Sequence, residues 1–279
     1  MKAVILAAGL GSRINSITRG LPKCLLKFGS RTILDFQIES LFQKGVRKLA
    51  VVVGFAADQV VEHVRGHHSD KLSNIAFITN PDFSSTNNMY SLWRAKEWLG
   101  KDPFLCLNAD VLCHPDIFVP ALSARADYSI VIDRHFREET TKVRIHKGRV
   151  LDLKKSLSRQ ECSGTFVGIA TFSPLGSRRL FAKAESMFAS GQVNQFFNDI
   201  LDQMCAEGAL VRFSETGALP WAEVDDPEDL RFAQVHVYPE VVRSPLSPQG
   251  RMRRACAERN PQATDFDPHL GGLVVLNRS

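Results

Sequence analysis

The N-terminal segment constrains the fold and the chemistry of this chain more than any other feature. The letters VILAA, residues 4–8, form an apolar run that leads directly into GLGSR, residues 9–13. A run of this kind predicts a buried strand over residues 2–7 that ends in a glycine-containing turn. Glycines let backbone N–H groups approach phosphate oxygens, and Arg13 and Lys23 add positive charge. The segment therefore predicts a strand that ends in a polyphosphate-binding turn.

Two familiar glycine-rich motifs do not fit this segment. A P-loop requires G-x-x-x-x-G-K-[ST], and no Lys-Ser or Lys-Thr pair follows these glycines. A dinucleotide-binding fingerprint requires G-x-G-x-x-G, but Ile14 takes the place of the third glycine. The remaining structural alternative is a tight strand–helix turn with two incidental cations. The combination of AAG-x-G-x-R with a following P-K favours the phosphate-binding interpretation.

The composition is consistent with an enzyme-sized α/β protein. The 279 residues are 44% apolar and 23% charged, enough to bury a sizeable core in one large domain or one domain with an appendage. The net charge of +5 suits anionic substrates but indicates no nucleic-acid partner. No apolar run approaches the roughly 18–20 residues that a membrane helix needs, and a strand that starts at the first residues leaves no room for a leader. We therefore expect a cytoplasmic protein without a membrane span.

The cysteines and histidines predict no metal site. None of the six cysteines belongs to a C-x-x-C pair, so we expect free core thiols rather than a zinc site or a disulfide framework. The eight histidines, including the adjacent His67 and His68, are expected at the surface or in loops. Neighbouring residues seldom point at one ion, which disfavours metal binding by that pair.

Apolar runs alternate with helical periodicity through the first part of the chain. The predicted elements here are strands over residues 2–7, 48–53, 75–79 and 104–108 and helices over 32–44, 57–65 and 88–98. Strands that are apolar on both faces and separated by helices predict an α/β fold with a Rossmann-like, doubly wound, mostly parallel sheet. Ligands bind such sheets at the carboxyl ends of the strands, where Gly9 and Asp110 both lie.

From about residue 127 the predicted strands are shorter and are separated by glycine or charged turns. The predicted elements of this part are strands over 128–133, 142–146, 149–153 and 165–172 and helices over 176–190 and 195–207. They predict a small mixed β extension beside the main sheet, within one catalytic domain of residues 1–238. Residues 239–279 are rich in Pro and Arg and lack periodicity, which predicts a poorly ordered tail. Within this tail, only the segment 273–276 is apolar enough to dock as a short strand.

Asp110 and Asp225 form a candidate metal site. Asp110 follows the predicted strand at 104–108, and Asp225 lies in the segment WAEVDD. Strand-end loops that are far apart in the sequence can converge on one cleft in a doubly wound fold. Because Mg²⁺ takes carboxylate oxygens together with substrate phosphate oxygens and water, two carboxylates suffice. The structural alternative is that Asp225 and Asp226 cap a helix that starts at Pro227.

These motifs together resemble those of the nucleotidyltransferases. The pattern L-A-A-G-x-G-[ST]-R followed by P-K is the signature of enzymes that make sugar nucleotides and related activated alcohols. Within that superfamily the chain resembles the bacterial cytidylyltransferases that activate phosphocholine, 2-aminoethylphosphonate and similar compounds. The segments that carry the resemblance span about residues 1–236: MKAVILAAGLGSR, LPKCLLKFGSRTILDFQIESL, VVVGF, NPDFSSTNNMYSLW, LNAD, FVGIATFS and WAEVDDPEDL. The letters TNNMYSL, residues 86–92, point to this branch rather than to glucose-1-phosphate enzymes.

The resemblance implies a nucleotide-diphospho-sugar transferase fold and a role for each matching residue. It implies that the nucleotide is bound by Leu6, Ala8, Gly9, Gly11, Ser12, Arg13, Lys23, Asn80, Thr86, Asn87 and Ala109. It also implies that Arg13 and Lys23 are catalytic and that Mg²⁺ is the cofactor, held by Asp110 and Asp225. The acceptor is expected to contact Asn88, Tyr90, Lys142 and Phe166.

The expected reaction joins CMP from CTP to a small phosphorylated alcohol or phosphonate and releases pyrophosphate. CTP and this acceptor are the expected partners, and a homodimer is one option for the assembly. A cationic acceptor would favour an aromatic cage with a nearby carboxylate. Phe136 and Trp221 are additional aromatic candidates for such a cage, and Glu138 and Glu223 are candidate acids.

Two other functions compete with this one. The first is a sugar-1-phosphate nucleotidyltransferase that uses UTP, GTP or dTTP on the same scaffold. The second is a nucleotide-sensing regulatory subunit that has kept the fold and lost catalysis. The presence of all four charged site residues disfavours the second function: Arg13, Lys23, Asp110 and Asp225.

Overall fold

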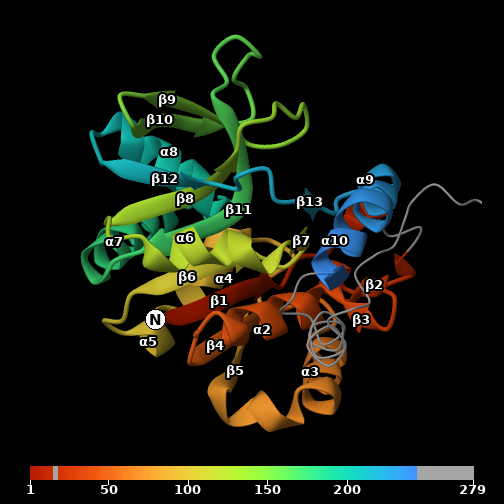
Figure 1. Ribbon diagram of the computed structural model, residues 1–279. Helices are drawn as coiled ribbons and strands as arrows, with labels where there is room; N and C mark the ends of the chain where they lie inside the picture. Colours follow the sequence, from red (N-terminus) through yellow and green to blue (C-terminus); the bar gives the residue numbers. More distant parts are fainter. Residues whose placement is uncertain (15–17, 244–279) are drawn as a thin grey trace, which may run out of the picture.

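Strand β1 (Lys2–Ala7) lies inside the parallel half of a nine-stranded sheet. The computed structural model describes residues 1–14 and 18–243, and Figure 1 shows their elements along the chain. β1 pairs in parallel with β4 (Lys48–Val53) and with β6 (Phe104–Asn108), and β5 (Ile75–Thr79) extends the sheet beyond β4. Parallel strands are covered on both faces, which explains their continuous apolar runs. All four strands have the bounds expected from the sequence.

The other half of the sheet is mixed. β11 (Gly164–Phe172) runs antiparallel beside β6, and β8 (Tyr128–Asp133) runs antiparallel beside β11. β12 (Val211–Glu215) then pairs in parallel with β8, and β10 (Arg149–Lys154) and β9 (Lys142–His146) complete the sheet. This confirms the mixed extension. β12 was not expected from the sequence. Its residues, VRFSE, alternate between apolar and polar, and most of them are at least partly exposed, so they form no continuous apolar run.

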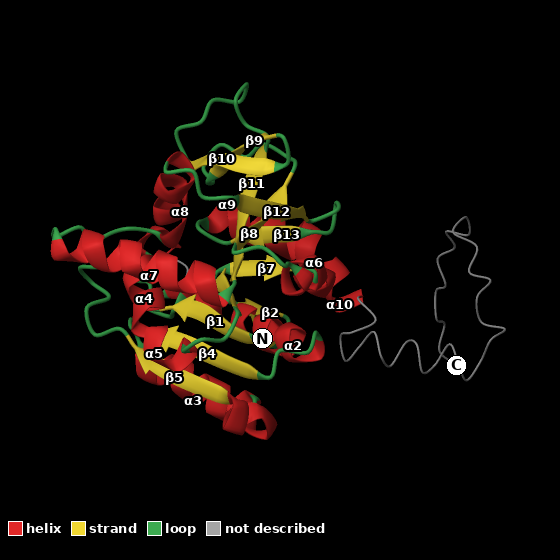
Figure 2. Cartoon of the chain, turned by 90° about the vertical axis from the view of Figure 1, so that its left-hand side faces the viewer, coloured by secondary structure: helices red, strands yellow, loops and turns green. Residues whose placement is uncertain are grey.

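Helices cover both faces of the sheet (Figure 2). One face carries α2 (Ile33–Gln43), α3 (Ala57–His67) and α6 (Phe118–Ser123). The opposite face carries α4 (Asn88–Arg94), α7 (Pro174–Ala189) and α8 (Phe197–Ala206). The doubly wound architecture is therefore confirmed. The single helix expected over 88–98 is divided at Ala95 into α4 and the short α5 (Lys96–Leu99).

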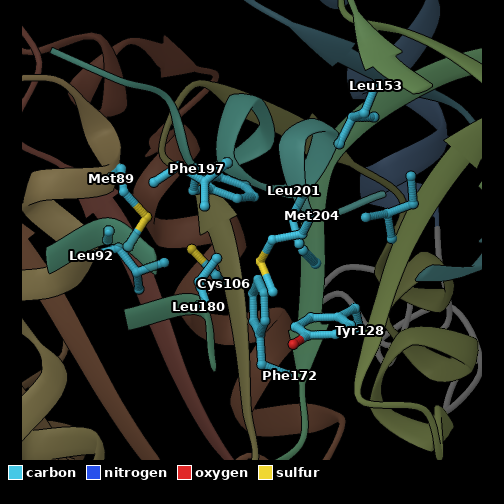
Figure 3. Packing of buried hydrophobic residues seen from close by; sticks show 14 of the residues in the cluster. Met89, Leu92, Cys106, Tyr128, Leu153, Phe172, Leu180, Phe197, Leu201 and Met204 are labelled. Carbon is cyan, nitrogen blue, oxygen red and sulfur yellow. The ribbon is translucent and has the colours of Figure 1, made fainter. Parts of the chain in front are cut away.

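One apolar cluster on each face anchors these helices. Figure 3 shows the cluster beneath α4, α7 and α8, in which Met89, Leu180 and Phe172 of β11 are buried together. On the other face, Leu34 of α2 and Val60 of α3 pack against the parallel strands. Burial of each such side chain contributes about 1.5–3 kcal/mol. The two clusters therefore fix the sheet between its helices and leave the strand ends to form loops.

A third apolar cluster joins the C-terminal helices to a small N-terminal hairpin. The hairpin consists of β2 (Lys27–Phe28) and β3 (Arg31–Thr32). On the other side of the cluster lie α9 (Pro227–Phe232), a π-helical turn (Ala233–Val237) and α10 (Tyr238–Arg243). The C-terminal helices therefore belong to the same packed body as the N-terminal turn.

The domain boundary expected at residue 239 falls inside α10. Residues 239–243 are helical, and Val241 is only 1% exposed within the third cluster. This part of the expected tail is ordered because Val241 and Val237, one turn apart, share an apolar surface. Residues 244–279, including the segment 273–276, lie outside the described residues.

His68 lies in the loop after α3, as expected for a histidine, but its side chain is buried rather than exposed. It is 2% exposed, and its Nε2 donates to Asp35 Oδ1 over 2.7 Å. His63 Nε2 donates to the same oxygen over 2.9 Å. A buried carboxylate on α2 therefore recruits two imidazoles, which the sequence spacing does not reveal.

The described cysteines are mostly core thiols, as expected. Cys24, Cys106, Cys113 and Cys205 are buried, and Cys162 is half-buried. Burial raises the pKa of the Cys24 thiol to about 12, so it is protonated at neutral pH. Cys256 lies outside the described residues. Among helices of residues 1–14 and 18–243, none is long and apolar enough to cross a membrane.

Candidate active site

A cleft of about 700 Å³ opens at the carboxyl ends of β1 and β6. Parallel strands place their following loops on the same edge of the sheet, so the cleft lies where a ligand site is expected. Most of the site residues expected from the sequence line it: Leu6, Ala8, Gly9, Gly11, Arg13, Lys23, Thr86, Asn87, Asn88, Ala109, Asp110, Phe166 and Asp225. The side chain of Ser12 lies outside the described part of the chain.

The turn after β1 requires glycine at residue 11. Gly11 has a φ of +61°, a conformation that side chains other than glycine adopt at a cost. A Cβ atom added there would also lie 2.9 Å from Cγ of Lys23. The glycine therefore lets the chain turn and lets the Lys23 side chain cross the turn into the cleft.

A two-stranded ribbon brings the two aspartates together. β7 (Val111–Cys113) starts directly after Asp110, and β13 (Trp221–Glu223) ends two residues before Asp225. The strands are antiparallel, with Glu223 opposite Val111. Beyond the ribbon, Val224 N donates to Asp110 O over 2.9 Å. This pairing explains how residues from distant parts of the sequence share one cleft.

Asp225 does not cap the following helix. The N-cap of α9 is Asp226, whose Oδ1 accepts from Glu228 N and Asp229 N over 2.8 and 2.9 Å. The Asp225 side chain instead faces the basic residues of the cleft. The structure therefore separates the two adjacent carboxylates into a helix cap and a site residue.

Lys23 lies between the two aspartates. Its Nζ donates to Asp225 Oδ1 and lies 3.7 Å from Asp110 Oδ2. Arg13 Nη2 donates to Asp225 Oδ2 over 2.6 Å. The Lys23 side chain is 13% exposed, whereas that of Arg13 is 55% exposed. Two cations and two carboxylates thus meet at the end of the glycine turn.

The carboxylates of this cluster differ in acidity. Burial of Asp110 raises its pKa, and the nearby Asp225 charge raises it further, while Lys23 acts in the opposite direction. Burial would also raise the pKa of Asp225, but Lys23 and Arg13 outweigh it and hold that pKa below its ordinary value. Burial, together with Asp110 and Asp225, raises the pKa of Glu223 to about 8. Glu223 is therefore mostly protonated at neutral pH, whereas Asp225 is ionised and paired with Lys23 and Arg13.

The donor set at Asp110 and Asp225 fits a hard divalent cation. Asp110 Oδ1 is buried and has no hydrogen-bond partner among the described residues. An unpartnered buried carboxylate oxygen beside a second carboxylate supplies the oxygen ligands that Mg²⁺ prefers. Within residues 1–14 and 18–243, no three His, Cys, Asp or Glu side chains form a metal site by themselves. Substrate oxygens and water would therefore have to complete the coordination.

The segment of residues 80–87 forms one wall of the cleft. Asn80 is buried beneath this wall and does not line the cleft; its Nδ2 donates to Thr86 Oγ1 over 3.1 Å and to Ser91 Oγ over 3.0 Å. Asn87 accepts from the N–H of Asn88 and caps α4. Asn80 thus supports the wall, whereas Thr86 and Asn87 face the cavity.

Two residues expected at the acceptor end do not line the cleft. Tyr90 points its OH at Asp82 Oδ2 over 3.2 Å, and its ring packs on Trp93 and Phe188. Lys142 is 3% exposed, and its Nζ donates to Lys155 O over 2.7 Å. Tyr90 is therefore part of an aromatic cluster, and Lys142 holds a backbone carbonyl.

The candidate cage residues Phe136 and Trp221 also lie outside the cleft lining. Trp221 is buried, donates from Nε1 to Asp133 Oδ2 over 2.6 Å, and carries Arg137 over its ring. Phe136 lies beside the cationic groups of Lys142 and Arg159. Neither aromatic ring is available to enclose a ligand in the cleft.

Sequence reasoning missed part of the cleft. Its other lining residues include Asn108, Lys155, Ser156, Asn198 and Asp199. Glu223, expected only as a candidate acid beside a cationic acceptor, also lines the cleft. Lys155 follows β10 and Asn198 lies in the first turn of α8, and neither element carries a motif. Only the packing of α8 onto the mixed half of the sheet brings them to the cavity.

The comparison with protein families matches the chain from β1 to beyond the end of α7. The family model of the MobA-like NTP transferase domain matches residues 3–194. This chain belongs to that family. The matched residues include the glycine turn, Lys23 and Asp110, whereas Asp225 lies beyond them.

Curated relatives include enzymes named for cytidylyl transfer. A CTP:phosphoglutamine cytidylyltransferase of Campylobacter jejuni is 25% identical over 190 residues, 62% of this chain and 73% of the relative. A CMP-5'-(3-aminopropyl)phosphonate synthase of Streptomyces rubellomurinus is 31% identical over 248 residues, 86% of this chain and 39% of the relative. A mannose-1-phosphate guanyltransferase of Aspergillus oryzae is 36% identical over 115 residues, 40% of this chain and 31% of the relative. The chain therefore spans less than half of the latter two proteins.

Solved structures show the same fold at lower sequence identity. The inositol-1-phosphate CTP transferase from T. maritima superposes with a TM-score of 0.74 at 19% identity, over 87% of this chain and 96% of that protein. A CTP:phosphocholine cytidylyltransferase from Streptococcus pneumoniae has a TM-score of 0.66 at 20% identity, over 84% of this chain and 97% of that protein. These matches confirm the nucleotide-diphospho-sugar transferase fold expected from the sequence.

Proposed function

We propose that this protein is a CTP-dependent cytidylyltransferase that joins CMP to a small phosphorylated alcohol or a phosphonate. The observation that carries the proposal is the position of Lys23 between Asp110 and Asp225 at the end of a glycine turn. A cation cluster at that point suits a triphosphate, and the carboxylates suit its metal ion. The names of the cytidylyltransferase relatives support CTP as the nucleotide.

The proposed nucleotide site is the β1 side of the cleft. Backbone N–H groups of Gly9 and Gly11 would hold phosphate oxygens, and Arg13 and Lys23 would neutralise their charge. The backbone of residues 6–8 would line the edge of the base, with Thr86 and Asn87 closing over it. This arrangement is supported by the lining of one continuous cavity by all of these segments.

The proposed reaction is an in-line displacement at the α-phosphorus of CTP. An oxygen of the acceptor phosphate or phosphonate forms the new P–O bond, and the bond to the β-phosphate breaks, so that pyrophosphate leaves with the electron pair. The acceptor oxygen is already anionic, so the reaction requires no general base. The main obstacle is the approach of two anions, and Arg13 and Lys23 reduce it by neutralising and orienting the triphosphate.

Asp110 and Asp225 are the proposed ligands of Mg²⁺. When bound there, Mg²⁺ would supply charge neutralisation on the phosphate oxygens. Lys23 carries three N–H donors, so it could direct one of them at the triphosphate while it keeps its contact with Asp225. Burial and the neighbouring Asp225 raise the pKa of Asp110, and a cation bound between the two carboxylates would lower it.

The proposed acceptor site is the opposite end of the cleft. Asn88 and Phe166 remain from the residues implied by the resemblance, and Lys155, Asn198 and Asp199 are added because they line the same cavity. Tyr90 and Lys142 are not part of this proposal. A lysine and an aspartate in one pocket suit an acceptor that carries a phosphoryl group and an amine.

The test is pyrophosphate release with a panel of nucleotides and acceptors. The protein is incubated with Mg²⁺, one of CTP, UTP, GTP or dTTP, and one of phosphocholine, phosphoethanolamine, 2-aminoethylphosphonate or a sugar 1-phosphate. Release with CTP and a non-sugar acceptor supports the proposal. Release only with UTP, GTP or dTTP and a sugar 1-phosphate would instead identify a sugar nucleotidyltransferase. Tight binding of CTP without turnover on any acceptor would identify a nucleotide-sensing protein.

A further inference from the structure

Gln37 connects helix α2 to the turn that carries Asp110. Its side chain is buried at 2% exposure, and its Nε2 donates to Asn108 O over 2.9 Å and to Val111 O over 2.8 Å. These two carbonyls lie on either side of Asp110 in the chain. Both N–H groups of a single carboxamide therefore hold the backbone segment from which the Asp110 side chain projects.

This arrangement carries a cost to stability. Gln37 Oε1 is buried and has no hydrogen-bond partner among the described residues. A buried polar atom without a partner loses its hydration without compensation. Neighbouring inward positions of α2 are apolar, Leu34 and Ile38 among them, and pack well against the sheet. A hydrocarbon side chain at residue 37 would fill the same space without the unpaired oxygen, but it would leave Asn108 O and Val111 O without these two hydrogen bonds.

We propose that Gln37 is a positioning residue for the metal ligand Asp110. By fixing the carbonyls of Asn108 and Val111, it sets the direction in which the carboxylate of Asp110 enters the cleft. The inference deepens the proposed function and rests on it for the identity of the metal site. Outer partners that orient a metal ligand typically change metal affinity by about 10–100-fold when removed.

The first measurement is Mn²⁺ affinity of the full chain, by electron paramagnetic resonance titration without nucleotide or acceptor. Gln37→Met keeps the length of the side chain and removes both donors. We expect it to weaken Mn²⁺ binding about tenfold or more and to shift the melting temperature by less than about 5 °C. Unchanged Mn²⁺ affinity in this variant would overturn the proposal.

Gln43→Met is the matched control. Gln43 lies at the end of the same helix, is half-buried, and makes no side-chain hydrogen bond with the described residues. This control should bind Mn²⁺ as the unaltered chain does. An equal loss of affinity in both variants would show a general effect on α2 and would overturn a specific role for Gln37.

A double-mutant cycle tests whether Gln37 acts through Asp110. In the Asp110→Asn background, Gln37→Met should produce little additional loss of Mn²⁺ affinity, because the ligand that it positions is already gone. An undiminished additional loss would mean that Gln37 acts elsewhere. If Gln37→Met is insoluble, Gln37→Asn replaces it, because a shorter amide cannot span both carbonyls and should also weaken binding; unchanged affinity would again overturn the inference.

The kinetic arm separates this inference from the proposed function. In Gln37→Met, the apparent KM for Mg²⁺ in pyrophosphate release should rise about tenfold, with a smaller change in the KM for CTP. An unaltered chain that releases no pyrophosphate with any acceptor would refute the proposed function alone, since the Mn²⁺ titrations still decide the role of Gln37. Equal increases in both KM values would argue against positioning of the metal ligand.

Discussion

At the scale of single residues, the charge balance of the cleft depends on Lys23. Its ammonium group is mostly shielded from solvent and contacts Asp225 while lying near Asp110. Arg13 contacts the same Asp225 carboxylate from a more exposed position. Removal of a buried lysine between two carboxylates costs more free energy than removal of an exposed lysine, because water screens the buried charges less. Lys23 is therefore the residue at which the proposed mechanism is most sensitive.

Lys23→Ala should reduce the rate of pyrophosphate release by about a hundredfold or more, since a charge-assisted contact to the transferring group is lost. The fold should persist, because Lys23 begins only a short 3-10 helix (Lys23–Leu25) before the β2–β3 hairpin and belongs to none of the apolar clusters. The control is Lys27→Ala, an exposed lysine in β2. A Lys23→Ala rate within about threefold of the unaltered chain would contradict the assignment of the triphosphate site.

Asp110→Asn and Asp225→Asn should each abolish metal-dependent turnover. The amide keeps the shape of the carboxylate but removes the charge that recruits the cation. Asp110→Asn should not lower the melting temperature, because the buried Asp110 carboxylate has a raised pKa and is costly to ionise. Rates and thermal unfolding of both single variants and the double variant decide this.

The double variant should be little worse than either single one, since both disable one shared ion. A defect equal to the product of the two single defects would mean that the two aspartates act independently.

At the scale of elements, α2 links a polar network on one face of the sheet to the cleft. Asp35, in its first turn, accepts from Thr32 N and Thr32 Oγ1 and from the two imidazoles of His63 and His68. Two residues further along, Gln37 contacts the backbone beside Asp110. These hydrogen bonds fix the start of α2, and the contacts of Gln37 join the same helix to the turn that carries the candidate metal ligand.

Asp35→Asn should lower the free energy of unfolding at pH 7 by about 2 kcal/mol or more, since it removes the charge from a buried hydrogen-bonded group. Burial alone would raise the pKa of Asp35, but hydrogen bonds from His63, His68 and Thr32 hold that pKa well below its ordinary value. The ionised Asp35 and its hydrogen bonds therefore stabilise the fold fully at pH values above the unfolded-state pKa of about 4. This contribution to the free energy of unfolding is lost progressively as the pH falls below that value.

The measurement for Asp35→Asn is urea unfolding at pH 7 and at pH 3. The stability difference between the unaltered chain and the variant should be smaller at pH 3, because the acid protonates Asp35 in the unfolded chain. Asp58→Asn, an exposed carboxylate in α3, is the control. A difference that is the same at both pH values would contradict the predicted low pKa.

At the scale of the whole molecule, one body contains the entire candidate site. The parallel half supplies the glycine turn and Asp110, the mixed half supplies Phe166 and Lys155, and the β7–β13 ribbon adds Asp225. None of the described cleft-lining residues follows Asp225. The C-terminal helices nevertheless matter, because the third apolar cluster packs them against the β2–β3 hairpin.

A chain that ends at Arg243 should fold and retain cytidylyltransferase activity, with kcat within about threefold, because it keeps every described cleft-lining residue and the whole of α10. A chain that ends at Tyr238 should melt at a temperature lower by about 5 °C or more, since it loses buried Val241. Thermal unfolding and activity of both chains test this. If the chain that ends at Arg243 is insoluble, or if light scattering shows that its oligomeric state has changed, docking of residues 273–276 would be favoured instead.

The sequence by itself determined the elements whose signal is local. β1, β4 and β6 lie where their apolar runs predicted them, since a strand buried on both faces needs such a run, and the half-buried edge strand β5 also has its expected bounds. The requirement for glycine at residue 11 and the presence of Lys23 in the cleft also follow from short-range spacing. The fold and the glycine-turn half of the candidate site could be predicted for this reason.

Only the tertiary structure decided the residues whose roles depend on distant partners. It assigned the helix cap to Asp226 and left Asp225 to the cleft, because the β7–β13 ribbon fixes where the chain enters α9. It turned Tyr90 and Lys142 away from the cavity and brought Lys155 into it. Gln37 carries no motif, and its contacts exist only because α2 packs over the end of β6. Such contacts join residues far apart in the chain, so no local pattern of the sequence records them.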